Sequence, residues 1–257
     1  MFDKQTILKF NINLGKYNDF KVEIIRNAKE KVSSYVCVAN VHMLVEAYRD
    51  NSFREIVGKA DIVTPDGMPL VSALKLLHGI KQDRVAGMDL LPDLLLEASK
   101  STLSVFFYGG TDDMMRLTAS HLASKYPDIK ASYYSPPFRQ LSNEEELSVI
   151  DTINSAAPNL VIVVLGCPKQ ERWMASMKGK INACMIGIGG ALPVMLGMQK
   201  RAPLWMQKTS LEWLYRLLQD PKRLLKRYFV TNSIFIFLLI KELIKIRVLR
   251  LNPVENN

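Results

Sequence analysis

The most informative polar residues follow an apolar run in the second half of the chain. Residues 159–165 are rich in β-branched side chains and have the length of a fully buried strand, and Lys169, Gln170 and Glu171 come soon after them. In open parallel α/β sheets, ligands bind just outside the carboxyl ends of the strands. These side chains therefore stand where a binding site would form, and the alternative is a solvated loop that begins a helix.

A carboxylate stands at the end of another apolar run. Asp66 follows residues 60–63 in the turn Thr64-Pro65-Asp66-Gly67, where proline and glycine fix a tight turn that could hold one carboxylate at a strand end. Taken alone, an Asp in such a turn more often bonds to its own backbone. The polar residues at the ends of neighbouring runs raise the odds of a functional role.

Those neighbouring residues are suited to binding a phosphate or a sugar. They are Asn40, Gly109, Gly110, Gly189 and Gly190. Paired glycines let a ligand approach the backbone closely. His42 shares the loop of Asn40 and could contact a ligand. Arg84 could reach the same edge, although an arginine between elements is more often simply a surface residue.

Several common signatures are missing from the sequence. It contains no Asp-x-Asp and no Walker A motif, and Gly187-x-Gly189 continues to Leu192, so the third glycine of a dinucleotide-binding loop is absent. Neither the three histidines nor the three cysteines show metal-ligand spacing. We therefore expect no metal and no other cofactor, and we interpret the cysteines as reduced core thiols.

The elements between these residues must position them. From residue 34 onward, apolar strand-like runs alternate with amphipathic helical stretches, which predicts an α/β fold with a mostly parallel, Rossmann-like sheet flanked by helices. The predicted strands span residues 34–40, 60–64, 103–109, 129–134, 159–165 and 182–188. The predicted helices span residues 41–57, 68–78, 88–100, 112–125, 143–156 and 169–178. The first 30 or so residues are predicted to add an edge strand and a helix over residues 19–31.

Positive charge is concentrated near the end of the chain. The net charge is +9, but residues 1–199 contain 22 Lys and Arg against 21 Asp and Glu, whereas residues 200–250 contain 12 against 3. We therefore divide the chain into an α/β catalytic body, residues 1–197, and a basic helical C-terminal appendage, residues 198–257. Such an appendage would attract nucleic acid, an anionic membrane surface or a diphosphate ligand.

The appendage contains an apolar segment, residues 233–240, between clusters of cationic side chains. A transmembrane helix needs about 20 apolar residues, so an interfacial helix fits this segment better. The alternative is an ordinary helix that packs on the core or in the interface of a homo-oligomer. The amino terminus lacks the features of a secretory signal, so we expect a cytoplasmic protein that is peripheral to the membrane.

An ordered set of motifs extends from about Val36 to Arg227. It comprises Asn40, Pro65-Asp66-Gly67, Arg84-Val-x-Gly87, Gly109-Gly110, Tyr126-Pro127, Gly166-x-Pro-Lys-Gln-Glu171, Gly189-Gly190, Arg201-Ala-Pro203 and Glu212-Trp-Leu-Tyr-Arg216. Together these motifs resemble the WecG/TagA/CpsF glycosyltransferase family of bacterial surface-polysaccharide and wall-teichoic-acid assembly. The resemblance implies an inverting, metal-independent transferase. It would move a sugar from a UDP-sugar donor to a polyprenyl-diphosphate-linked acceptor at the inner membrane surface, without a nucleic acid partner.

The resemblance also implies roles for individual residues. Asp66 matches the proposed general base, which takes the proton from the acceptor hydroxyl. Gln170 matches a residue associated with the donor nucleotide, and three arginines match those that a membrane-docking appendage supplies to stabilise the departing diphosphate. With Asp66 as the catalytic residue, the predicted substrate-binding residues are Asn40, His42, Arg84, Gly109, Gly110, Gln170, Glu171, Gly189, Gly190, Arg216, Arg223 and Arg227.

The chain departs from the family pattern at several positions. Val38 stands where many members have Thr, and His42 is a candidate replacement for that contact. The donor sugar is therefore open among N-acetylmannosamine, glucose, galactose and a uronic acid. Two alternatives belong to other classes: a nucleotide-binding oxidoreductase, which the missing glycine argues against, and a non-catalytic basic adaptor that binds membrane head groups or nucleic acid.

Overall fold

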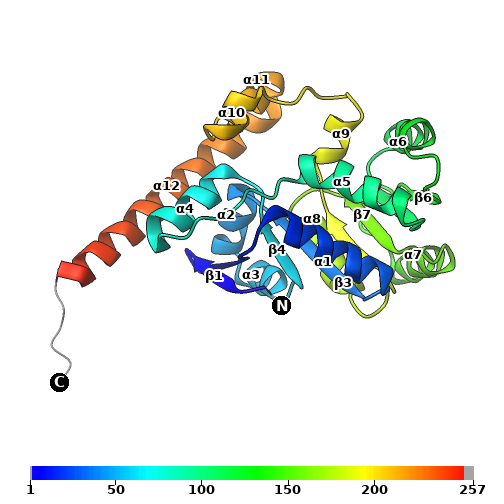
Figure 1. Cartoon of the computed structure of the whole chain (residues 1–257), viewed down its shortest axis with the longest axis horizontal. Coiled ribbons are helices and arrows are strands. Elements are labelled where there is room, and N and C mark those ends of the chain that lie inside the picture. Colours follow the sequence, from blue (N-terminus) through cyan, green and yellow to red (C-terminus); the bar gives the residue numbers. More distant parts are fainter. Residues whose placement is uncertain (1, 252–257) are drawn as a thin grey trace.

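The computed structural model describes residues 2–251 and shows a parallel sheet with helices on both faces (Figure 1). The six strands lie in the order β4-β3-β8-β7-β5-β6. Their bounds are β3 (Ser34–Ala39), β4 (Ile62–Pro65), β5 (Val105–Gly109), β6 (Ala131–Tyr134), β7 (Leu160–Val164) and β8 (Cys184–Gly187). One face is covered by α2 (Val41–Arg49), α3 (Asn51–Gly58), α4 (Met68–His78), α7 (Asn143–Ser155) and α8 (Lys169–Met177). The other is covered by α1 (Tyr17–Lys29), α5 (Gly87–Lys100), α6 (Asp112–Lys125) and α9 (Ala191–Met195).

Strand β3 illustrates why the sheet is covered on both faces. All six of its residues are buried, and its side chains alternate between two separate cores. Tyr35, Cys37 and Ala39 pack with α2, α3 and α4, whereas Val36 and Val38 pack with α1 and α5. A strand buried on both sides needs a continuous apolar run, which is the pattern that the sequence shows.

The strand order decides which loops meet. β4, β3, β8 and β7 are neighbours and run parallel, so the loops after their carboxyl ends lie side by side. These loops begin at Asp66, Asn40, Ile188 and Leu165. β5 lies on the far side of β7, and Gly110 therefore follows a strand that is farther from Asp66. The site is thus restricted to four of the six strand ends.

The predicted α/β class, the parallel sheet and its six strands are confirmed, and two details of the prediction are wrong. The predicted helix over residues 41–57 is two helices, because Asp50 leaves the helical conformation and its side chain caps the start of α3. The predicted edge strand of the first residues is instead a hairpin, β1 (Lys4–Ile7) and β2 (Phe10–Asn13), which forms its own two-stranded sheet. The hairpin is tied to β4 by a bond from the Val63 amide to the Asn13 side chain, at 2.7 Å.

Three helices form the end of the chain: α10 (Leu204–Lys208), α11 (Glu212–Gln219) and α12 (Pro221–Leu251). Figure 1 shows α12 leaving the body as a long helix, and it packs against α2 and α4 near its middle. Phe235 is buried in the core there, and Leu224 and Leu238 are also buried. One face of α12 is therefore an ordinary packed helix. The division of the chain at residues 197 and 198 stays a prediction, and residues 252–257 of the appendage lie outside the described residues.

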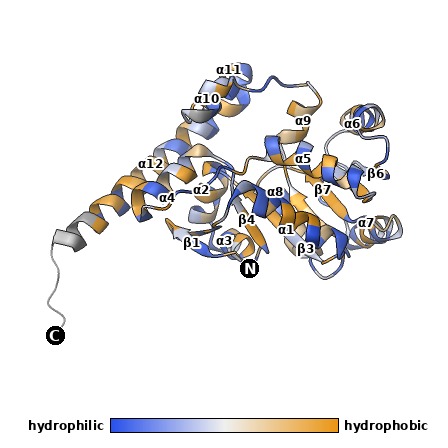
Figure 2. Cartoon of the chain, viewed as in Figure 1, coloured by the Kyte–Doolittle hydropathy of each residue, from blue (hydrophilic) through white to orange (hydrophobic). Residues whose placement is uncertain are grey.

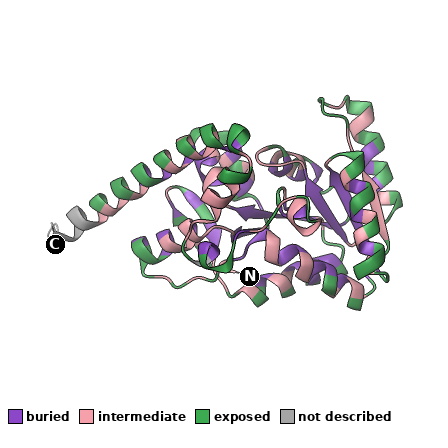
Figure 3. Ribbon diagram, turned by 90° about the horizontal axis from the view of Figure 1, so that it is seen from above, coloured by how far each residue is buried: buried purple, intermediate pink, exposed green. Residues whose placement is uncertain are grey.

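The opposite face of α12 is open to solvent (Figure 3), and Figure 2 shows hydrophobic segments along the length of this helix. Its exposed large apolar side chains are Leu225, Phe229, Ile236, Phe237, Ile240 and Ile244. We call this set the α12 stripe. No helix in the described part of the chain has the length and hydropathy needed to cross a membrane.

Candidate active site

A cleft of about 680 Å³ lies at the carboxyl edge of the sheet, between the four strand ends and helices α11 and α12. Ten of the thirteen predicted site residues line it. They are Asn40, His42, Asp66, Arg84, Gln170, Gly189, Gly190, Arg216, Arg223 and Arg227. The structure therefore brings residues from six separate parts of the sequence to one cavity.

Asp66 lies half-buried in this cleft, directly after β4. Its backbone amide bonds to the carbonyl of Ala39 at 2.8 Å, which fixes the turn against the end of β3. Its Oδ1 accepts a bond from the amide of Gly87 at 3.3 Å. Burial and the nearby negative charge of Glu212 raise the pKa of Asp66 to about 6, although Arg216 and Arg84 act in the opposite direction. A carboxylate with this pKa is ionised at neutral pH and can still accept a proton effectively.

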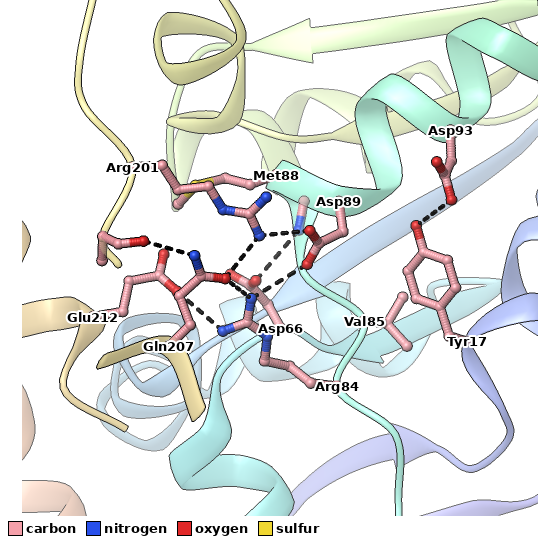
Figure 4. Close-up of polar contacts among 12 residues, drawn as sticks. Tyr17, Asp66, Arg84, Val85, Met88, Asp89, Asp93, Arg201, Gln207 and Glu212 are labelled. Carbon is pink, nitrogen blue, oxygen red and sulfur yellow. Dashed lines mark hydrogen bonds and ion pairs between the residues drawn. The ribbon is translucent and has the colours of Figure 1, made fainter. Parts of the chain in front are cut away.

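Arg84 is held by a side chain five residues later in the sequence and by two side chains from the distant appendage (Figure 4). It donates to Glu212 at 3.0 Å, to Asp89 at 3.3 Å and to Gln207 at 3.4 Å. Arg201 donates to the same Asp89 at 2.5 Å and to the same Gln207 at 3.1 Å. This cluster joins α5 of the body to α10 and α11 of the appendage. Since charged partners surround Arg84, its guanidinium has a fixed position beside Asp66.

The three predicted appendage arginines differ in their partners. Arg216 pairs with Glu212 at 3.5 Å and contacts the sulfur of Met88. Arg223 pairs with Asp220, one turn earlier, at 2.6 Å. The Nε atom of Arg227 is buried and has no hydrogen-bond partner among the described residues. Arg227 therefore retains bonding capacity that a ligand in the cleft can use.

Gln170 sits beneath the glycines that follow β8. Its Oε1 accepts a bond from the amide of Gly166 at 3.2 Å, and its Nε2 donates to Glu171 at 2.7 Å. A Cβ atom at Gly187 would stand 2.8 Å from the Gln170 Nε2, so only glycine leaves room for the amide. Burial raises the pKa of Glu171. The Gln170 amide is thus locked in one orientation at the wall of the cleft.

Asn40 and His42 open helix α2 at the same edge. The Asn40 side chain accepts a bond from the Met43 amide at 3.2 Å and caps the helix. The Nδ1 atom of His42 is buried, with no hydrogen-bond partner among the described residues. Burial and the neighbouring charge of Arg227 lower the pKa of His42, so its imidazole is neutral near pH 7.

Three of the predicted residues lie outside the cleft. Gly109 and Gly110 are displaced from it by strand β7, and a Cβ atom at Gly109 would stand 2.7 Å from the backbone of Val164. Close packing against β7 therefore explains why glycine occupies position 109. The Glu171 side chain is fully buried behind Gln170 and does not line the cleft, and its role in binding substrate stays a prediction.

The sequence interpretation missed several residues that shape the cleft. Glu212 and Arg201 stand inside motifs that carried the family resemblance, but no role was assigned to them. Asp89 and Gln207 belong to no recognised motif. Their roles depend on the docking of the appendage against α5, which sequence spacing does not reveal.

Comparison with known proteins identifies the family. The sequence profile of the glycosyl transferase WecG/TagA/CpsF family matches residues 5–248. The chain belongs to this family. The WecG/TagA/CpsF resemblance inferred from the motifs is thereby confirmed, and the protein is a glycosyltransferase.

Three relatives of this WecG/TagA/CpsF protein carry one enzyme name, N-acetylglucosaminyldiphosphoundecaprenol N-acetyl-beta-D-mannosaminyltransferase. The relative from Bacillus subtilis (strain 168) is 31% identical over 214 residues, or 83% of this chain and 81% of the relative. The one from Bacillus spizizenii is 32% identical over 191 residues, or 74% and 73% of the two chains. The one from Staphylococcus aureus (strain MW2) is 28% identical over 224 residues, or 87% and 84%.

The cleft combines arginine side chains, which can bind an anion, with the Asp66 carboxylate, which forms no ion pair among the described residues. Among residues 2–251, no group of three or more His, Cys, Asp or Glu side chains is placed to hold a metal ion. Metal independence in this WecG/TagA/CpsF protein stays a prediction.

Proposed function

We propose that this glycosyltransferase moves a sugar from a UDP-sugar to a polyprenyl-diphosphate-linked acceptor, with inversion at the anomeric carbon. The observation that carries the proposal is the half-buried Asp66 carboxylate, with its pKa of about 6, in a cleft lined by four arginines. The names of the relatives support a diphosphoundecaprenol-linked acceptor, and N-acetylmannosamine is the first donor sugar to test.

Asp66 acts as the general base. The acceptor hydroxyl oxygen attacks the anomeric carbon and its proton passes to the Asp66 carboxylate, while the bond from that carbon to the diphosphate oxygen breaks. The bonding electrons leave with the UDP diphosphate. Attack opposite to the leaving group inverts the anomeric configuration.

Arginines stabilise the negative charge that develops on the departing diphosphate. Arg216 and Arg227 line the cleft from the appendage side, and a guanidinium binds phosphate oxygens through two parallel hydrogen bonds. Gln170, held by Gly166 and Glu171, presents a fixed amide to the donor nucleotide. Such preorganised donors stabilise a transition state because they need no rearrangement when charge develops.

The α12 stripe docks the enzyme on the inner membrane surface. Phe229 is 75% exposed and Phe237 is 64% exposed, which is costly in water and favourable at the acyl boundary of a bilayer. Lys222, Lys226 and Lys241 are exposed on the same helix and can contact anionic head groups. Because the same helix carries Arg223 and Arg227 into the cleft, membrane docking places the cleft beside its lipid-linked acceptor.

The test is a donor panel with release of nucleoside diphosphate as the readout. Purified protein is mixed with UDP-sugars and a polyprenyl-diphosphate-linked N-acetylglucosamine, and UDP release should require both substrates. Asp66→Asn should abolish release while donor binding is retained. Asp112→Asn, at an exposed position on α6, is the matched control and should behave like the wild type. A fully active Asp66→Asn variant would refute the base assignment, and polyanion binding without any sugar turnover would favour the adaptor.

A further inference from the structure

The Asp66 carboxylate has two cationic neighbours and pairs with neither of them. Arg216 and Arg84 are near enough to lower its pKa, yet within the described residues its side chain accepts only the Gly87 amide. A buried carboxylate beside guanidinium groups normally forms an ion pair with them, because pairing offsets the loss of hydration. Something must therefore hold the two guanidinium groups away from Asp66.

Glu212 occupies both of them. One of its carboxylate oxygens pairs with Arg84 at 3.0 Å and the other pairs with Arg216 at 3.5 Å. Glu212 is the first residue of α11, where a negative side chain is also favoured by the helix dipole. Its side chain is only 20% exposed, so its charge is poorly screened by water.

We infer that Glu212 is a positioning residue, which withholds Arg84 and Arg216 from Asp66 and so keeps the catalytic carboxylate free to accept a proton. The inference rests on the proposed function, because it takes Asp66 as the base. Glu212 does not touch the reacting atoms. It acts through the two arginines, and its own negative charge adds to the proton affinity of Asp66.

The two arginines held by Glu212 differ in how firmly they are fixed. Arg84 has further partners in Asp89 and Gln207, so it stays in place when Glu212 moves. Arg216 has only the longer pair with Glu212 and a weak contact to the Met88 sulfur among the described residues. An incoming diphosphate can therefore exchange with the Glu212 carboxylate at Arg216, while Arg84 remains anchored.

The test compares the dependence of kcat/KM on pH in three proteins: the wild type, Glu212→Gln and Asp89→Asn. The Gln variant keeps the size and the hydrogen-bond acceptor but loses the charge, so Asp66 becomes a weaker base. The acidic limb of its kcat/KM profile, where activity falls as the pH is lowered, should move to lower pH by on the order of half a unit to one unit. The value of kcat at neutral pH should also fall. Asp89→Asn removes an equal charge from the same cluster, but Arg84 stays paired with Glu212 and bonded to Gln207, so the acidic limb of this variant should stay in place.

The outcomes separate this inference from the proposed function. An acidic limb that does not move in Glu212→Gln, or one that moves equally in Asp89→Asn, overturns the role of Glu212. Glu212→Ser is too short to reach either guanidinium and makes the same test if the Gln variant does not fold. Loss of the proposed function is recognised independently, because the wild type would then release no UDP or Asp66→Asn would remain active.

Discussion

Protonation of Asp66 is expected to inactivate the enzyme between pH 7 and pH 5. Burial and Glu212 raise its pKa from 3.8 to about 6. The base must be ionised, so activity is present above this pKa and is lost as the pH falls through it. At pH 5 about one tenth of the molecules would carry the ionised carboxylate, whereas an ordinary aspartate would be about nine tenths ionised. The expected loss of kcat/KM from pH 7 to pH 5 is therefore about tenfold.

The assay measures UDP release at low donor concentration across this range, so that kcat/KM reports the free enzyme. Tryptophan fluorescence at each pH checks that the protein stays folded. His42 also lines the cleft and has a lowered pKa, so it is a second candidate for the acidic limb. His42→Asn should leave the limb near pH 6, because the limb belongs to Asp66. A limb near pH 4, or one that disappears in His42→Asn, would show that the burial of Asp66 does not control the base.

Three further predictions concern Gln170 at the wall of the cleft, the Asn40 cap at the edge of the sheet and the α12 stripe. Gly187→Ala places a Cβ atom 2.8 Å from the Gln170 Nε2, so KM for the donor should rise and the overpacking should also lower the melting temperature; an unchanged KM would contradict the role of Gln170. Asn40→Ala removes the cap of α2 and should lower the free energy of unfolding by about 1 kcal/mol in a urea titration; an unchanged value would contradict the capping role. Phe229→Asp should weaken sedimentation with anionic vesicles and spare activity on a water-soluble acceptor, whereas Leu117→Asp, exposed on α6, should leave vesicle binding intact. Equal losses in both variants would argue against the α12 stripe.

The sheet was predictable because its signal is local. Strands β3 and β7 are buried on both faces, and burial of this kind demands an uninterrupted apolar run that is visible in the sequence. The amino-terminal hairpin was missed because its turn uses Leu8 and Lys9 with positive φ, where a sequence normally signals a hairpin with glycine or asparagine. Tertiary packing against β4 compensates for that unfavourable turn.

The site was predictable only as far as strand ends could be recognised. Asn40, Asp66 and Gln170 meet because their strands are neighbours, but Gly109 and Gly110 follow a strand that β7 separates from them. Strand order is a property of the whole fold, and no local pattern in this sequence encodes it. The pairing of Arg84 with Glu212 joins residues 128 positions apart, so it required the docked appendage to be seen.

The cleft must satisfy two opposing electrostatic demands. A carboxylate base whose pKa lies near neutral pH needs few unpaired cations beside it. A departing diphosphate, in contrast, needs several cations to stabilise its negative charge. The appendage meets both because two of its arginines bring their own counter-ions: Glu212 pairs with Arg216, and Asp220 pairs with Arg223. In the proposed mechanism, these carboxylates neutralise the cations until a diphosphate arrives to replace them. The pairs lie within one helix turn of their arginines, so the exchange needs only side-chain rotation and leaves the packing of α12 undisturbed.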